Sequence, residues 1–145
     1  MDIKIDYLKH AELGQYKALI DEAFNNSNPL STYEKSYDEN SPSYKIIVAK
    51  DGDKLIGSLT IYRLDLFTFD SQPTLEVYNV AVLKEYRGGD AATLLFDFLK
   101  KFALDNNYAS ISLTCLADAH RAHNFYEKMG FNKIDRMRFT MEVGE

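Results

Sequence analysis

The sequence predicts a mixed α/β fold: a central, mostly antiparallel twisted sheet that contains one parallel strand pair, flanked by about four helices. Two observations predict this class. Segments that alternate between polar and apolar residues cluster between residues 45 and 82, and segments with apolar residues at helical spacing stand on either side of them. A helical segment also separates the last of these strands from a further strand. A helix that joins two strands of one sheet gives a right-handed crossover and a parallel pair.

The composition predicts one globular domain over residues 1–145, long enough to bury a core. Hydrophobic residues make up 46% of the chain and charged residues 27%, which disfavours disordered, collagen-like and membrane classes. No apolar run approaches the ~20 residues that span a bilayer. The N-terminal segment lacks the apolar core of a signal peptide, so we expect a cytoplasmic protein without a membrane partner.

The charge and the cysteine content exclude further classes. The net charge is −5 and no basic block is present, which argues against a nucleic-acid partner. The lone Cys115 can form no intramolecular disulfide, and no Cys/His spacing resembles a zinc site, so we expect no metal. Cys115 itself is expected to be a small buried residue at the end of a strand.

The first half of the chain predicts a strand, two helices and an antiparallel meander. Residues 2–7 alternate like a strand, and the polar segment 30–44 allows a short second helix within a loop. Strands follow at 45–50, 55–67 and 74–82, with turns at 51–53 and near Asp70 to Pro73. The first helix ends by Asn25, and its apolar residues are Leu13, Tyr16, Leu19, Ile20 and Phe24.

The second half predicts the crossover, a last helix and a last strand. A helix that ends at Asn106–Asn107 leads to the strand ASISLTC, which we expect to place Ile111 to Cys115 beside Val77 to Val82. Asp118 is expected as the N-cap of the last helix, with Gly130 as its stop, and Lys133 to Val143 as a final strand. The apolar stripe of the crossover helix is Leu94, Leu95, Phe98, Leu99 and Phe102, and that of the last helix is Ala122, Phe125, Tyr126 and Met129.

The stretch YRGGDAATLL, from Tyr86 to Leu95, has the pattern of an anion site. Amides in the first turn of a helix lack internal partners and carry partial positive charge, which stabilises an anion by roughly 0.3–2 kcal/mol. Arg87 adds a forked cation, and the two glycines let the backbone approach a bulky ligand. Asp90, however, places a carboxylate where a phosphate would bind. On its own this stretch is a weak signal, because many strand–loop–helix junctions bind nothing, and an ordinary turn is then the better explanation.

Two motifs together resemble the GCN5-related N-acetyltransferase (GNAT) superfamily. They are VYNVAVLKEYRGGDAATLL and, some thirty residues later, AHRAHNFYEKMGF. In that family the first motif is a hydrophobic strand followed by Arg/Gln-x-x-Gly-x-Gly/Ala at a helix start, and the second reads Ala-x-x-Phe-Tyr-x-x-x-Gly-Phe. The predicted element order fits the family over the whole chain, and the motif match is strongest from Leu75 to Phe131.

The resemblance implies a site for acetyl-CoA between two splayed strands. Val80, Ala81 and Val82 would lie along the pantetheine arm through their backbone groups. The loop and helix start would wrap the diphosphate, and these residues are Arg87, Gly88, Gly89, Asp90, Ala91, Ala92 and Thr93. Ungapped alignment puts Asp90 at the motif's central glycine and Ala92 at its last small residue. Ala119 stands where the family often has an asparagine that contacts the cofactor.

The resemblance also implies an acid and a base. Tyr126 would protonate the departing thiolate, which suits a phenol whose ordinary pKa is ~10. Glu76, four residues before Val80, matches the catalytic glutamate of one branch of the family, and alternation places it on one strand face with Tyr78 and Val80. Glu76 is equally well explained as a structural residue, and Tyr126 without its motif as a core aromatic.

The acceptor site has weaker signals. Tyr78 would line it, and the segment with Tyr33, Tyr37 and Tyr44 is either a further wall or a generic loop. The sequence thus predicts transfer of an acetyl group from acetyl-CoA to a primary amine of a small molecule or peptide, by direct attack in a ternary complex. The alternatives are a non-catalytic binding or regulatory module of the same fold and the use of another acyl-CoA. The resemblance admits a homodimer, although no residue identifies an interface.

Overall fold

The structure is a computed structural model that describes residues 2–67 and 72–144. The chain divides into two compact units, Met1–Thr114 and Cys115–Glu145. The turn predicted near Asp70 to Pro73 lies partly outside the described residues. Among the described residues, no helix combines the length and the apolar character that crossing a membrane requires.

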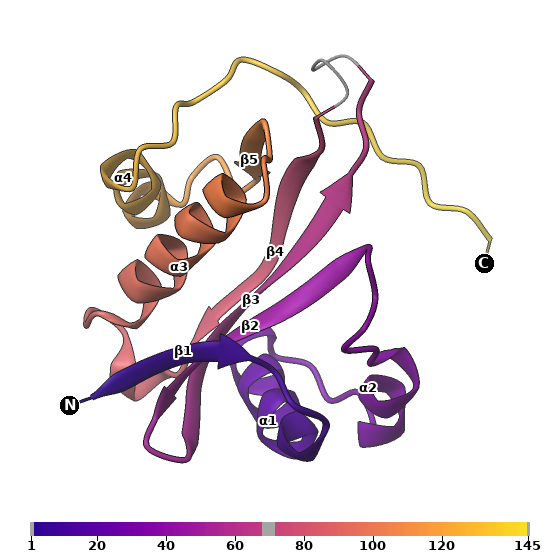
Figure 1. The fold of residues 1–145 in the computed structure, drawn as a ribbon, viewed down its shortest axis with the longest axis vertical. Coiled ribbons are helices and arrows are strands. Elements are labelled where there is room, and N and C mark those ends of the chain that lie inside the picture. Colours follow the sequence, from indigo (N-terminus) through magenta and orange to yellow (C-terminus); the bar gives the residue numbers. More distant parts are fainter. Residues whose placement is uncertain (1, 68–71, 145) are drawn as a thin grey trace. The chain divides into compact units, whose positions relative to one another are not determined.

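The larger unit contains a five-stranded sheet in the order β1-β2-β3-β4-β5 (Figure 1). The first four strands pair antiparallel, and β4 and β5 pair parallel, which confirms the predicted mixed sheet. Their bounds are β1 Ile3–Tyr7, β2 Tyr44–Asp51, β3 Lys54–Leu64, β4 Thr74–Val82 and β5 Ser110–Leu113. The β2–β3 turn contains Gly52 at a φ of 61°, a conformation that glycine adopts without steric penalty.

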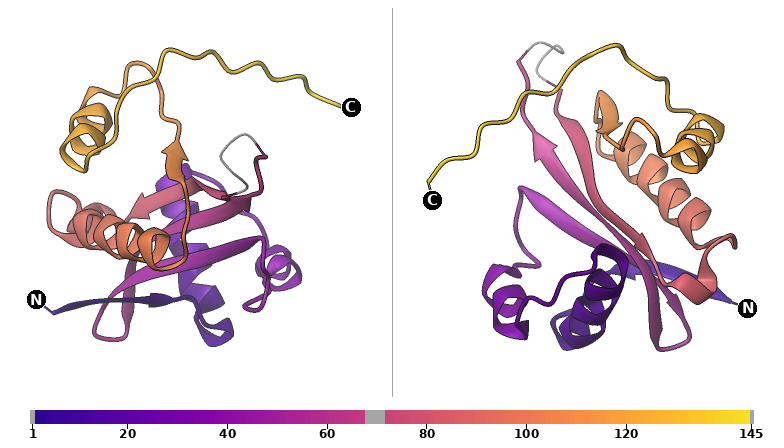
Figure 2. Two further views of the ribbon diagram at one scale, coloured as in Figure 1. Left: turned by 45° about the horizontal axis from the view of Figure 1, so that its top comes forward. Right: turned by 180° about the vertical axis from the view of Figure 1, so that it is seen from behind.

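Helices cover both faces of this sheet. The helix α1 (Leu13–Phe24) follows a short 3-10 turn, η1 (His10–Glu12), and ends at Asn25 in the left-handed conformation; α2 (Leu30–Ser36) follows it. These two helices lie on one face, and α3 (Ala91–Asp105) lies on the other (Figures 1 and 2). The predicted first, second and crossover helices are therefore confirmed.

The face under α1 holds an apolar core made by residues that the sequence pattern singled out. Leu13, Tyr16, Leu19 and Ile20 of α1 are buried, as the helical spacing predicted. They pack with sheet residues that include Val48 and Ala81. On the opposite face, Leu95 and Leu99 of α3 are fully buried, while Ala91, Phe96 and Ala103 are more deeply buried than the outer members of the predicted stripe.

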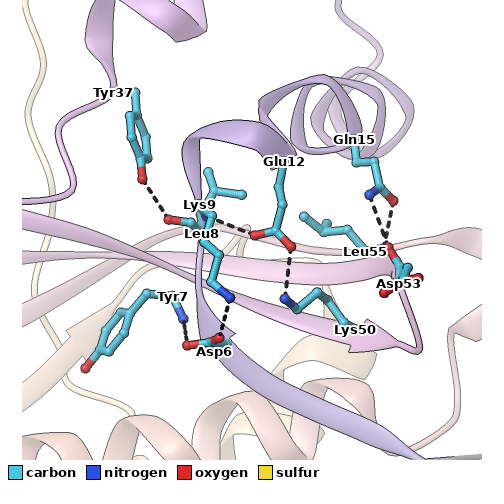
Figure 3. A network of polar contacts seen from close by, with 10 residues as sticks. All are labelled: Asp6, Tyr7, Leu8, Lys9, Glu12, Gln15, Tyr37, Lys50, Asp53 and Leu55. Carbon is cyan, nitrogen blue, oxygen red and sulfur yellow. Dashed lines mark hydrogen bonds and ion pairs between the residues drawn. The ribbon is translucent and has the colours of Figure 1, made fainter.

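A polar network joins η1 and the start of α1 to the sheet (Figure 3). Glu12 accepts a hydrogen bond from the backbone amide of Lys9 and forms an ion pair of 2.9 Å with Lys50 of β2. Gln15 donates to the carbonyl of Asp53 at 3.1 Å and accepts from the amide of Leu55 at 3.0 Å. The first turn of α1 is thereby fixed to the β2–β3 turn.

The smaller unit contains α4 (His120–Lys128). The N-cap of this helix is Ala119, which follows the predicted Asp118 by one residue. Ala119 makes no side-chain cap hydrogen bond. Gly130 has a φ of 102°, and the amide of Phe131 donates to the carbonyl of Tyr126 at 3.0 Å. The predicted glycine stop, with Phe131 folded back on the helix, is confirmed.

The predicted final strand from Lys133 to Val143 is wrong for the described residues, because 132–144 contain no strand. Its large apolar side chains are exposed by 66–92%: Ile134, Met137, Phe139, Met141 and Val143. A strand needs a neighbour that pairs with its backbone N–H and C=O groups.

Gly57 of β3 is closely packed against β4. A Cβ there would lie 3.1 Å from the carbonyl oxygen of Ala81, so the backbone of β4 must shift by a few tenths of an ångström, and it would be in ordinary contact with Cδ1 of Leu95 at 3.5 Å. We expect Gly57→Ala to lower the unfolding free energy by about 1–3 kcal/mol in urea denaturation. Gly14→Ala is the matched control, because nothing lies within 4 Å of its added Cβ in α1, and it should gain up to about 1 kcal/mol. Equal effects at both sites would contradict this account.

Candidate active site

The strand β4 contains a β-bulge at Asn79. Across the β3–β4 ladder, Ser58 faces Ala81 and Thr60 faces Tyr78, so two residues of β4 lie opposite a single residue of β3. Asn79 has a φ of 54°, in the left-handed region that asparagine adopts more readily than most residues. A bulge of this kind bends the strand and changes the direction of the side chains that follow it.

The bulge separates residues that simple alternation placed together. Glu76 faces Tyr62, and Tyr78 faces Thr60, so both lie on the sheet face covered by α1, as does Ala81. Val82 faces Gly57, whose added Cβ would contact Leu95 of α3, and Val80 lies one residue before Ala81. The predicted shared face of Glu76 and Val80 is therefore wrong, because the extra residue turns the strand over.

The parallel pairing of β4 with β5 is shorter and lies earlier than predicted. It joins Thr74–Val77 to Ser110–Leu113, whereas we had expected Val77 to Val82 beside Ile111 to Cys115. Beyond Val77, no described residue pairs with the side of β4 that faces β5. The strand edge of β4 is thus unpaired after Val77 within the described chain. The bulge at Asn79 bends β4 away from β5 at the same place, so the backbone of Val80 belongs to the unpaired edge.

The loop after β4 is tied to the sheet at several points. The amide of Leu83 donates to the carbonyl of Ile56 at 2.8 Å, and a 3-10 turn, η2 (Lys84–Tyr86), follows. Tyr86 donates its hydroxyl to Asp51 at 2.9 Å, and Glu85 pairs with Lys54. These contacts hold the start of the YRGGDAATLL stretch against the β2–β3 turn.

Arg87 and Gly88 complete the turn into α3. Arg87 donates from Nε to the carbonyl oxygen of Val82 at 3.0 Å, and its side chain is otherwise exposed. Gly88 has a φ of 85°, which a residue with a Cβ adopts only with strain. Arg87 is therefore fixed by its hydrogen bond to β4, and Gly88 allows the backbone to turn into α3.

Asp90 occupies the N-cap position of α3. Its backbone φ and ψ are −93° and −5°, its carbonyl accepts from the amide of Leu94 at 2.9 Å, and its side chain makes no cap hydrogen bond. Of the next residues, Ala91 is buried, Ala92 is half-buried and Thr93 is exposed. The amides of the first turn are thus not capped by Asp90, and its exposed carboxylate stands beside them.

Glu76 lines a hollow of about 420 Å³ on the α1 side of the sheet, together with Tyr62, Leu64, Tyr78 and Asn79. The structure brings together the predicted pair Glu76 and Tyr78. It adds Tyr62, which the sequence reasoning missed. The available signal was alternation within β3, which puts Tyr62 on the same face as Thr60 and directly opposite Glu76.

The other tyrosines of the predicted acceptor wall have different positions. Tyr44 does not line this hollow but lies next to it, because its ring centroid is 5.9 Å from that of Tyr62. Tyr33 packs edge-on against Tyr16 at 5.9 Å, and Tyr37 donates its hydroxyl to the carbonyl of Leu8 at 2.9 Å. Tyr33 and Tyr37 therefore hold α2 and its following loop in place, and Tyr44 is the member of the segment nearest to Glu76's hollow.

Tyr126 lies on α4 in the smaller unit. Burial raises the pKa of its hydroxyl above the ordinary value of 10.0, and Cys115 adds to this shift. Cys115 is exposed, so the expectation of a buried residue is wrong; β5 ends at Leu113, before it. His123 hydrogen-bonds the carbonyl of Leu116 at 2.9 Å, and the described residues contain no group of three potential metal ligands.

Solved structures define the fold class to which this sheet belongs. A transcriptional regulator from Bacillus halodurans C-125 superposes with a TM-score of 0.86 at 18% identity, covering 98% of this chain and 100% of that one. AAC(6')-Iy in complex with the bisubstrate analogue CoA-S-monomethyl-acetylneamine superposes with a TM-score of 0.85 at 12% identity, covering 99% and 100%. At these identities the similarity shows the fold alone.

The family follows from the sequence. The profile of the acetyltransferase (GNAT) family matches residues 13–131, so the chain belongs to this family. An uncharacterized N-acetyltransferase of Halalkalibacterium halodurans is 31% identical over 101 residues, which cover 67% of this chain. The chain spans about half of that relative, 53% of its length. The predicted family and fold are confirmed.

The left-handed conformation of Asn79 gives a stability test of the bulge. We expect Asn79→Val to lower the unfolding free energy by about 1–2 kcal/mol, since a β-branched residue is strained at this φ, and Asn79→Gly to be nearly neutral. Urea denaturation measures both. Asn107, with a φ of 60° after α3, provides the matched pair Asn107→Val and Asn107→Gly. If valine and glycine at position 79 were equally destabilising, backbone strain would not explain the bulge's residue preference.

Proposed function

We propose that this chain transfers an acetyl group from acetyl-CoA to a primary amine, by direct attack in a ternary complex. One observation carries the proposal: β4 opens away from β5 at a bulge, directly before a loop and an uncapped helix start. An opened strand edge can hydrogen-bond the amides of a pantetheine arm, and helix amides bind phosphate oxygens. Membership of the GNAT family supports the same reaction class.

In this proposal the backbone of Val80, Ala81 and Val82 holds the arm of acetyl-CoA, and residues 87–93 hold its diphosphate. The residues present fit that role in two respects. Gly88 leaves space over the loop, since an added Cβ there would meet nothing within 4 Å. The exposed Arg87 guanidinium, anchored through Nε, can direct its terminal nitrogens at a phosphate.

The chemistry requires an amine lone pair, an oxyanion site and a proton donor. The amine nitrogen attacks the thioester carbonyl carbon after its extra proton passes to Glu76, directly or through a water. Backbone amides near Val80 to Val82 stabilise the charge that develops on the carbonyl oxygen. The carbon–sulfur bond then breaks, and Tyr126 gives its hydroxyl proton to the thiolate. The nitrogen of the new amide loses its second proton, which returns through solvent to the tyrosinate of Tyr126. The raised pKa of Tyr126 suits this role, because the phenol remains protonated at neutral pH.

A second candidate is a non-catalytic module of the same fold, and Asp90 is the observation that favours it. Thermal unfolding separates the two, because a ligand that binds only the folded chain raises its melting temperature. A shift with acetyl-CoA supports the enzyme, and no shift at millimolar concentration supports the module. Comparing acetyl-, propionyl- and succinyl-CoA identifies the acyl chain.

Removal of the carboxylate of Asp90 should strengthen the binding of acetyl-CoA. Asp90→Asn keeps a residue that is equally favoured at an N-cap and removes one negative charge beside the diphosphate. Two unit charges about 4 Å apart interact by ~1 kcal/mol in water, so calorimetry should show roughly a five-fold lower Kd. The matched control is Asp97→Asn, an exposed aspartate further along α3, which should leave Kd unchanged. A weaker affinity in Asp90→Asn would show that the carboxylate serves the site.

The acid and base assignments predict two kinetic losses. Tyr126→Phe and Glu76→Gln should each lower kcat about 100- to 10,000-fold in a CoA-release assay, with little change in the Kd of acetyl-CoA. Because the pKa of Tyr126 lies above 10.0, the wild-type rate should not fall on the alkaline side until above pH 10 through this group. Tyr108→Phe and Glu127→Gln are matched controls outside the proposed machinery. Full turnover in both test variants would overturn the two assignments.

A further inference from the structure

Tyrosine side chains form a row on the sheet face under α1 and α2, across the neighbouring strands β2, β3 and β4. Tyr44 is the register partner of Tyr62, and Tyr62 is the register partner of Glu76. Tyr78 stands two residues after Glu76 and on the same face. The ring centroids of Tyr44 and Tyr62 are 5.9 Å apart, and those of Tyr62 and Tyr78 are 5.6 Å apart. The row therefore leads from Glu76 across two strands.

These rings are accessible. Tyr62 and Tyr78 are each 37% exposed although they stand in strands of the sheet, and both line the hollow of about 420 Å³ that contains Glu76. Tyr44 is fixed at the far end, because its hydroxyl donates to the carbonyl of Ser36 at the end of α2. The hollow thus has aromatic walls and, in Glu76, one carboxylate.

Such a surface attracts cations. The face of a tyrosine ring carries partial negative charge and attracts an ammonium group within about 6 Å of its centroid. The chain uses this interaction elsewhere, where Lys45 lies 5.9 Å from the ring of Tyr7 and Lys54 5.4 Å from that of Tyr86. On the row, the carboxylate of Glu76 increases the attraction for a cation and repels an anionic acceptor.

We propose that the acceptor is a linear di- or polyamine, whose primary amine reacts beside Glu76 while a second ammonium group lies on the rings of Tyr62, Tyr78 and Tyr44. This inference rests on the proposed acetyl transfer and names its acceptor class. Neighbouring strands are ~4.8 Å apart, so the second cation lies roughly 5–10 Å from Glu76. That spacing suits a diamine such as putrescine or cadaverine.

The surroundings of Tyr44 accommodate longer polyamines. Tyr44 also lines a second hollow, of about 360 Å³, at the ends of β1 and β2. The carboxylates of Asp6, Asp38 and Glu39 line the same hollow, and the ammonium groups of Lys9 and Lys45 line it too. Its net charge is therefore −1, and a third ammonium group of a polyamine that follows the row past Tyr44 would meet a small excess of negative charge.

The test compares two acceptors of equal length, putrescine and 4-amino-1-butanol, in the CoA-release assay with acetyl-CoA. The second compound keeps the reacting amine and replaces the distal ammonium by a hydroxyl. We expect kcat/KM to be about three- to thirty-fold higher for putrescine. A diamine whose distal nitrogen is trimethylated should retain this advantage, because aromatic faces bind quaternary ammonium groups that cannot donate hydrogen bonds. Equal kcat/KM values for putrescine and the amino alcohol would overturn the inference.

Variants identify the rings. Tyr62→Leu and Tyr78→Leu should reduce the putrescine preference to nearly one, whereas Tyr62→Phe, which keeps the ring face, should preserve it. Tyr108→Leu is the matched control, since Tyr108 stacks on Phe102 away from the row, and it should keep the full preference. Thermal unfolding checks that each variant is folded. A preference that survives Tyr62→Leu combined with Tyr78→Leu would contradict the assignment.

Failure of the acceptor inference can be distinguished from failure of acetyl transfer. If acetyl-CoA binds and amines are acetylated without preference for the second cation, only the acceptor inference is wrong. If no amine is acetylated, calorimetry with putrescine and with tetramethylammonium still tests the row. Binding that is lost in Tyr62→Leu supports it, and binding that is absent in the wild type overturns it.

Discussion

The geometry of the candidate site depends on one extra residue in β4. The bulge at Asn79 places two residues of β4 opposite one residue of β3, so the strand bends and leaves the parallel pairing with β5 after Val77. Without it, an unbroken β4 could continue pairing, and the backbone near Val80 would be occupied by a ladder. The extra residue also reverses the side-chain alternation of β4, so that Glu76 and Val82 point to opposite faces of the sheet.

This reversal separates two tasks. On the α1 side, Glu76, Tyr62 and Tyr78 line the hollow that we propose as the acceptor site, while beyond the bulge the strand leads to Arg87 and the start of α3. In the proposed reaction an amine and a thioester must meet at one point from different directions. The bulge reverses the side-chain directions of β4 within a few residues. The backbone groups of this strand can therefore serve as the meeting point of the two substrates, and backbone groups are held more rigidly than side chains.

The sequence predicted the elements better than it predicted their registers. The helical spacing of Leu13, Tyr16, Leu19 and Ile20 reports a buried face directly, so α1 was correctly predicted. A bulge has no such periodic signal, and the two errors that follow from it concern the face of Val80 and the extent of the β4–β5 pairing. Tyr62 was missed because its importance depends on a cross-strand partner, Glu76. Lys133 to Val143 was predicted as a strand, but the sequence alone contains no information about whether a pairing edge is present.

Asp90 is best understood by comparing the energies at the start of α3. Its exposed carboxylate opposes a diphosphate by ~1 kcal/mol per pair of unit charges about 4 Å apart in water, and salt reduces this further. Each hydrogen bond from a helix amide to a charged oxygen contributes about 1.5–3 kcal/mol, and Arg87 adds a charge-assisted contact. Two such amide bonds outweigh the repulsion, provided that the carboxylate does not itself bind those amides. Asp90 makes no such cap bond. In the proposed site the carboxylate would therefore weaken the binding of a diphosphate without preventing it.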